Sequence, residues 1–242
     1  MEANIPTRQR RHFPYKHPTF GTPKRPKGEA AWKGSVYYWW WAYLKRNRKY
    51  LNCCDLGGEG ALASLYEAFG DVRGDDFKKW WSIGDRGANL FAEKPVEESF
   101  KVIPIGESIK AKEGSLTLVV PLNFPKRFLL ARFSEVLTVE HKGKRGHQKA
   151  KDSELTYRIK GQPNLKALEL GLKVYDMVQQ NPEIALWEVG NSIPELLRVQ
   201  KIKKGDTPSS IADKKRRITI IVSRYLSRTK GYIENTGAGC FI

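Results

Sequence analysis

The sequence contains few cysteines, and their spacing fits neither a disulfide framework nor a zinc site. There are three, of which Cys53 and Cys54 are adjacent and Cys240 stands alone. Disulfide frameworks need an even set of spaced cysteines, and zinc sites need paired Cys or His ligands at short spacing. A reducing compartment is therefore the simplest setting for this chain, and we predict a cytoplasmic protein.

Long hydrophobic runs are also lacking. No segment approaches the roughly 18 consecutive apolar residues that indicate a membrane-spanning helix. The first residues, MEANIPTRQRRHFPYKHP, have no apolar centre, so they do not predict a secretory signal. We expect no membrane-embedded part.

Acidic residues are scarce relative to basic ones. The chain has 242 residues, with 43 Lys and Arg against 26 Asp and Glu, which gives a formal charge of +17. A field of this sign attracts polyanions, and phosphate contacts supply most non-specific binding to nucleic acid. An anionic membrane surface is the competing interpretation. We favour nucleic acid over a membrane because no polybasic stretch lies on an amphipathic membrane helix. Of the two nucleic acids, we predict DNA in preference to RNA.

Catalytic signatures are absent as well. We find no HExxH, no phosphate-binding GxxxxGK[ST] loop and no GxSxG elbow. We therefore predict no catalytic residues, no metal and no cofactor. One alternative is a metal-dependent nuclease, if the fold gathers the side chains of Glu135, Glu140, His141 and His147. Asp71, Asp75 and Asp76 are further acidic candidates, but we expect Asp75 or Asp76 to cap a helix from Phe77.

The first 30 residues predict a basic disordered arm. Five prolines oppose helix formation there, and seven Lys and Arg face only two Glu. Such an arm is either solvated or follows phosphates in a groove, and these two roles are compatible. Arg10 and Arg11 are its candidate contacts.

Residues 31–98 predict an aromatic-rich helical region. The segment VYYWWWAYLKRNRKY (36–50) fits one helix, GALASLYEAF (60–69) a second and DFKKWWSI (76–83) a third. Most rings at helical spacing should fill a core, although some could instead stack on bases. Successive helical residues lie about 100° apart, so we expect one of the three consecutive tryptophans, Trp41, to face a partner.

Residues 99–160 predict a small α/β region. Strands are expected at 100–105, 115–122 and 155–159, with a helix over 125–137. Between the helix and the last strand lies a glycine-interrupted basic loop, residues 141–151. A strand, basic loop and strand fit a β-wing beside a phosphate backbone, with a mobile surface loop as the alternative. Lys142, Lys144 and Arg145 are its candidate contacts.

Residues 161–242 predict helices over 164–180, 183–191 and 209–235, with Thr207–Pro208 opening the last. Two helices, a basic turn and an amphipathic basic helix follow the order of a helix-turn-helix module. In such modules the last helix enters the major groove, where Arg pairs with guanine and Ser or Thr contacts phosphate. A solvated basic face is the alternative. The predicted nucleic-acid contacts of this helix are Lys214, Lys215, Arg216, Arg217, Ser223, Arg224, Arg228 and Lys230.

Several of these stretches together resemble a known group of bacterial proteins. They are VYYWWWAYLKRNRKY, LASLYEAFGDV with FKKWW and LFAE, and ITIIVSRYLSRTKGYIENTGAGCF. They are similar to proteins encoded by prophages and integrative elements, including helix-turn-helix accessory proteins of retron antiviral systems. The resemblance covers most of residues 36–242 and carries over no active-site residue. It implies DNA binding and a place in phage defence beside a reverse transcriptase with its RNA–DNA product.

We therefore predict a mainly α protein with a small β element and a helix-turn-helix-like C-terminal region. Its predicted function is nucleic-acid binding without catalysis. An interaction protein or defence effector that holds a nucleic-acid-bearing partner is the second hypothesis, and the metal-dependent nuclease is the third. The oligomeric state and the target sequence stay open.

Overall fold

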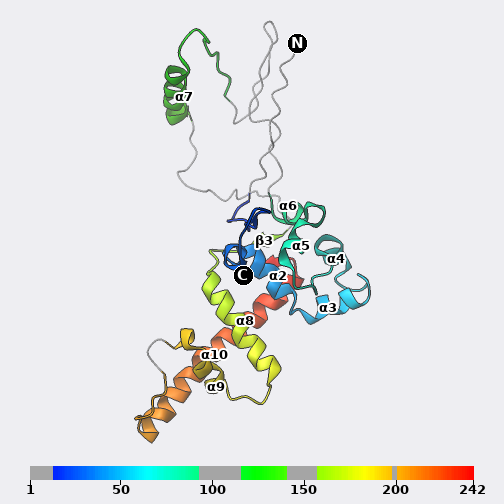
Figure 1. Ribbon diagram of the computed structural model, residues 1–242, viewed down its shortest axis with the longest axis vertical. Coiled ribbons are helices and arrows are strands. Elements are labelled where there is room, and N and C mark those ends of the chain that lie inside the picture. The colour runs from blue at the N-terminus through cyan, green and yellow to red at the C-terminus, as the bar shows by residue number, and fades with distance from the viewer. Residues whose placement is uncertain (1–12, 93–115, 141–156, 198–200) are drawn as a thin grey trace. The chain divides into compact units, whose positions relative to one another are not determined.

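The computed structural model describes residues 13–92, 116–140, 157–197 and 201–242. The chain divides into two compact units. The larger combines Met1–Lys94 with Glu154–Ile242, and the smaller is Pro95–Ser153. Helices dominate the described residues and the strands are short, so the predicted mainly α class with a small β element is confirmed (Figure 1).

The larger unit is built from short helices around two longer ones. Its N-terminal part contains β1 (Gly21–Thr22), β2 (Arg25–Pro26), α1 (Glu29–Lys33), α2 (Val36–Leu44), α3 (Arg48–Asp55), α4 (Ala63–Phe69), α5 (Phe77–Ser82), η1 (Ile83–Asp85) and α6 (Arg86–Phe91). Its C-terminal part contains β3 (Arg158–Ile159), α8 (Leu165–Gln180), α9 (Leu186–Ser192), η2 (Pro194–Leu196), α10 (Pro208–Gly237) and β4 (Cys240–Phe241).

Helix α2 lies at the centre of an aromatic core. Eight of its nine residues are buried, and Ser35 caps its amino end by accepting a hydrogen bond from the Tyr37 amide. The Trp40 ring packs between Phe69 and Phe91, with centroids 5.9 and 5.3 Å away. A helix that is apolar on all sides is stable only when other elements surround it. Helices α1, α8 and α10 all contact α2.

The prediction that Trp41 faces a partner is wrong. Trp39, Trp40 and Trp41 are 6%, 0% and 4% exposed. Trp41 packs against Phe77, with centroids 5.3 Å apart, and the Lys45 ammonium lies 4.7 Å from its ring. The argument from 100° spacing assumed a helix with one solvent face, whereas α2 has neighbours on every side.

The predicted helix over 36–50 is interrupted at Asn47. This residue takes an extended backbone conformation, and its side-chain oxygen accepts a hydrogen bond from the Tyr50 amide, so it caps α3. Its side-chain nitrogen donates to the Ile233 carbonyl at 2.7 Å. Asn47 is only 6% exposed, so one buried amide both starts α3 and joins it to α10.

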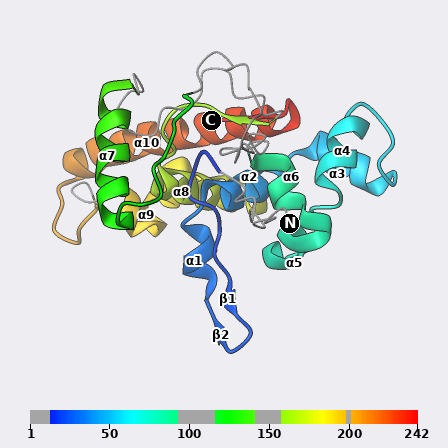
Figure 2. The same cartoon turned by 90° about the horizontal axis from the view of Figure 1, so that it is seen from above.

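The disordered arm predicted for residues 1–30 is wrong for its second half. Phe13, Tyr15 and Phe20 pack against the aromatic core. The Tyr15 hydroxyl donates to the Gly161 carbonyl at 2.8 Å. Residues 21–26 then form an antiparallel hairpin that projects from the unit beside α1 (Figure 2). The charge and the prolines of this segment predicted disorder. Burial of its three aromatic side chains orders it instead.

The aromatic region and the C-terminal helices belong to the same unit, which corrects the predicted boundary between them. Strand β3 confirms the end of the strand predicted over 155–159. It pairs in parallel with β4, so that Arg158 lies opposite Cys240 and Ile159 opposite Phe241. Phe241 is fully buried and packs 5.6 Å from Trp40. The last residues of the chain therefore complete the core built by α2.

A second apolar cluster joins α8, α9 and α10. It contains Leu170, Val174, Val189, Ile193, Leu197, Ile218 and Val222. Two glycines let these helices approach closely. A Cβ atom on Gly171 would lie 2.4 Å from Thr229 Oγ1, and one on Gly190 would lie 2.4 Å from the Ile218 side chain.

In the smaller unit the structure describes residues 116–140. Helix α7 (Lys126–Glu140) confirms the helix predicted over 125–137. The strand predicted over 115–122 is wrong for residues 116–122, which have no regular structure, and Pro121 lacks the amide that a strand ladder needs. The strand predicted at 100–105 lies outside the described residues. None of the described helices combines the length and apolarity needed to cross a bilayer.

The close packing of α9 on α10 predicts opposite effects for two glycine substitutions. Gly190→Ala should lower the free energy of unfolding by about 1–3 kcal/mol, because its methyl group overlaps Ile218 and Val222. Gly231→Ala is the matched control inside α10, where an added Cβ meets nothing within 4 Å. It should raise stability by up to about 1 kcal/mol through helix propensity. Urea denaturation measures both, and equal effects would contradict this packing.

Candidate nucleic-acid interface

Helix α10 is the longest described helix and begins where the sequence predicts. Thr207 is its N-cap, with its hydroxyl accepting a hydrogen bond from the Ser210 amide at 3.3 Å, and Pro208 is the first helical residue. The helix has 30 residues and is therefore about 45 Å long. This length carries it past α9, α8 and α2, all of which it contacts (Figure 1).

One side of α10 is buried along much of its length. Ile218, Val222, Thr229, Ile233 and Thr236 are its buried residues, at spacings of three, four and seven. This spacing places them on a single helical stripe. That stripe faces both apolar clusters, so the opposite side of the helix is turned to solvent.

The opposite side carries most of the predicted contacts, and we call it the basic face. Its exposed members are Arg216, Arg217, Ile220, Ser223, Arg224, Ser227, Arg228 and Lys230. At 100° per residue these positions fall within an arc of about 160°. From Arg216 to Lys230 they extend along about 21 Å of helix. The structure therefore brings together six of the eight contacts predicted on this helix.

Most cations of the basic face have no counter-ion among the described residues. Within the ranges that the structure describes, no carboxylate forms an ion pair with Arg216, Arg224, Arg228 or Lys230. Arg217 is the exception, because its guanidinium pairs with Asp213 one turn earlier at 2.8 Å. Both partners of that pair are more than half exposed, so it is weak and can exchange for a phosphate.

Lys214 and Lys215 lie away from the basic face. The Lys214 ammonium is 2.6 Å from both carboxylate oxygens of Asp206, in the turn before α10. The Lys215 ammonium lies 3.9 Å from the centre of the Trp187 ring on α9. These two lysines therefore anchor the start of α10 to its own unit, and their contact with nucleic acid stays a prediction.

Asp206 is held as a carboxylate by these contacts. Its Oδ2 atom accepts a hydrogen bond from the Lys203 amide at 2.7 Å. That bond and the Lys214 ammonium lower the pKa of Asp206 below its ordinary value. The turn over 201–206 is consequently closed by a charge-assisted contact at neutral pH.

The connection between α9 and α10 spans residues 193–207 and includes η2. A helix-turn-helix joins its two helices by three or four residues. The structure thus has the predicted order of helices without that tight turn. The other predicted contacts, Arg10, Arg11, Lys142, Lys144 and Arg145, lie outside the described residues, as does the proposed β-wing over 141–151.

A cleft lies beside the end of the basic face, and sequence reasoning missed it. Its volume is about 670 Å³, and its walls come from the start of α3, the start of α4 at Leu62, and the ends of α8 and α10. Four basic residues line it, namely Arg46, Arg48, Lys49 and Lys230, against one acidic residue, Glu234. The prediction of a single helix over 36–50 places the basic run KRNRK at the end of that helix. The break at Asn47 instead places Arg48 and Lys49 at the start of another.

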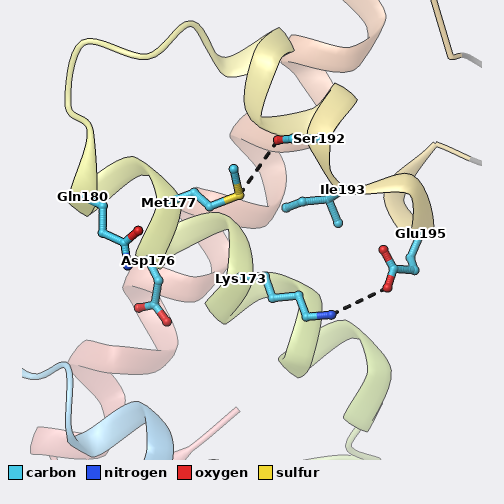
Figure 3. Close-up of a pocket in the computed structure, with 7 residues that line it drawn as sticks. All are labelled: Lys173, Asp176, Met177, Gln180, Ser192, Ile193 and Glu195. Carbon is cyan, nitrogen blue, oxygen red and sulfur yellow. Dashed lines mark hydrogen bonds and ion pairs between the residues drawn. The ribbon is translucent and has the colours of Figure 1, made fainter.

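A smaller pocket of about 370 Å³ between α8 and α9 offers little for binding (Figure 3). Its one lysine, Lys173, lies within 3.6 Å of carboxylate oxygens from Glu169 and Glu195. Its aspartate, Asp176, forms a bidentate ion pair with Arg46. The charged groups of this pocket are therefore already paired.

The three aspartates that were candidates for a nuclease site form ion pairs or cap a helix. Asp71 pairs with Arg73, Asp75 pairs with Lys45, and Asp76 caps α5 by accepting a hydrogen bond from the Lys79 amide. Among the described residues, no group of three or more His, Cys, Asp and Glu is placed to hold a metal ion. His141 and His147 lie outside those residues.

The Asp206–Lys214 pair predicts a difference in acid sensitivity. Because the pKa of Asp206 is lowered by folding, its contribution to stability is present above its ordinary pKa and is lost as the pH falls through the folded value. Lys214→Met should destabilise the protein at neutral pH and flatten the loss of stability on acidification. Arg216→Met, on the exposed side, should leave that acid dependence unchanged. Urea denaturation between about pH 2 and pH 7 measures both, and identical profiles would contradict an anchoring role for Lys214.

Comparison with known proteins adds no assignment. No family model, curated protein or solved structure matches this chain. The resemblance to prophage-encoded proteins and retron accessory proteins stays a prediction. Any function must therefore be argued from the charge and geometry of the site.

Proposed function

We propose that this protein binds nucleic acid through the basic face of α10. The observation that carries the proposal is the alignment of Arg216, Arg224, Arg228 and Lys230 on one exposed helical face without counter-ions among the described residues. Elsewhere on the larger unit, ion pairs to carboxylates neutralise cations such as Lys33, Arg46 and Lys166. Binding therefore uses a surface whose charge is available without breaking internal contacts.

The side chains of the basic face suit a phosphate-lined groove. Arginine forks bind phosphate oxygens and guanine edges, and Ser223 and Ser227 supply short hydroxyl groups between them. Ile220, which is 42% exposed at the middle of the face, offers an apolar contact for a thymine methyl group.

Duplex DNA is the preferred target in this proposal. An α-helix of about 10–12 Å diameter fits the B-form major groove, which is about 12 Å wide. The major groove of A-form RNA is too narrow for a helix to enter. We place this activity in the cytoplasm, and the three free thiols are consistent with a reducing compartment.

A second candidate function is supported by the smaller unit, which exposes apolar side chains. Val119, Leu122 and Val139 are 96%, 85% and 75% exposed. We propose that these side chains contribute to a surface that meets another protein. The chain would then hold a protein partner together with its nucleic acid. Poor DNA binding by the isolated chain, with recovery of a nucleic-acid-bearing partner, would favour this second function.

The first function is tested by replacing Arg216, Arg224 and Arg228 with alanine together. Each lost phosphate contact reduces the slope of log K against log salt by about 0.9, so the slope should fall by about 2.7. The matched control replaces Lys33, Lys166 and Lys173, which are ion-paired elsewhere on the larger unit, and removes the same charge. Fluorescence anisotropy with labelled duplex DNA measures both variants. Equal losses would show that net charge alone drives binding and would reject the basic face as the site.

A further inference from the structure

Most cations that line the cleft at the end of the basic face form no ion pair with other described residues. Among the residues that the structure describes, the Arg48 guanidinium donates to the neutral Gln179 side chain, at 3.1 Å, and pairs with no carboxylate. For Lys49 and Lys230 no ion pair is present within the described part of the chain. Arg46 differs, because its charge is neutralised by Asp176. Three cations thus face the cleft against the carboxylate of Glu234.

The cleft also has apolar walls. Leu62 and Tyr175 are half-buried side chains on its lining, and the buried Ile233 also lines it. The volume of about 670 Å³ is within the range of small-molecule sites. The amino end of α3 adds the partial positive charge of a helix dipole near Arg48 and Lys49. A ligand with one flat apolar part and one anionic part matches these walls.

We propose that this cleft binds a nucleotide, with its phosphate at Arg48, Lys49 and Lys230 and its base against Leu62 and Tyr175. Lys230 belongs to both the basic face and the cleft, so a strand held by α10 leads directly to it. The ligand on this account is the phosphorylated end of a strand, and this assignment rests on the proposed function. A free mononucleotide carries the same chemistry and is the other source to be tested.

Three kinds of variant separate charge from shape in the cleft. Arg48→Ala with Lys49→Ala removes the phosphate contacts, and Lys33→Ala with Lys166→Ala is a charge-matched control outside the cleft. Leu62→Trp fills the space for the base without changing the charge. Glu234→Gln removes the opposing carboxylate and should tighten binding. Circular dichroism and urea denaturation check that each variant is folded.

The assay compares labelled strands that end in a phosphate with the same strands that end in a hydroxyl, and adenosine monophosphate is titrated separately. Because charge-assisted hydrogen bonds to a phosphate are stronger than neutral ones, the wild type should prefer the phosphorylated end by about tenfold or more. The Arg48/Lys49 and Leu62 variants should lose that preference, while the control keeps it. Tight binding of the mononucleotide with no preference between strand ends would assign the cleft to free nucleotides.

Two failures are distinguishable. If the wild type binds strands in a salt-dependent way but shows no preference for a phosphorylated end and no affinity for the mononucleotide, the cleft proposal is overturned and the basic face stands. If the wild type binds no strand or duplex at all, the proposed function fails. Mononucleotide binding that Arg48→Ala with Lys49→Ala abolishes would, in that case, still support the cleft.

Discussion

Burial of α2 on all sides is the constraint on which the rest of the larger unit depends. A helix with three consecutive tryptophans cannot meet water without exposing a large apolar area, so each neighbouring segment must cover part of it. Helices α8 and α10 cover it from far along the sequence, and Phe241 completes the cover. Phe13 and Phe241, which are far apart in the sequence, are therefore brought together in the core around one aromatic helix.

This constraint also decides which side of α10 is free. The stripe that includes Ile218, Val222 and Ile233 is committed to the two apolar clusters, and the close contacts at Gly171 and Gly190 leave little room for the helix to rotate. The arginines on the far side are consequently held in fixed positions on a rigid element. A fixed array of cations loses less entropy on binding than cations on a mobile tail. The packing of α10 therefore holds part of the chain's excess positive charge on one exposed helical face.

Local patterns predicted the long helices well, because caps and apolar periodicity are properties of neighbouring residues. The sequence predicted the helix over 164–180, the start of α10 at Thr207–Pro208 and the apolar period of α10. The errors arose where distant residues decide the outcome. Asn47 starts α3 inside the predicted helix, and its amide nitrogen also donates to the carbonyl of Ile233, 186 positions away. The cleft is built from four separated segments and had no local signal.

The central claim is that the basic face of α10 contacts nucleic acid. The most direct measurement is photo-crosslinking to duplex DNA from an unnatural amino acid placed at Ser223, which is exposed at the middle of the face. The same group placed at Lys173, at the pocket between α8 and α9, is the reference. The account predicts a strong crosslink from Ser223 and little from Lys173. Equal yields, or a crosslink from Lys173 alone, would contradict it.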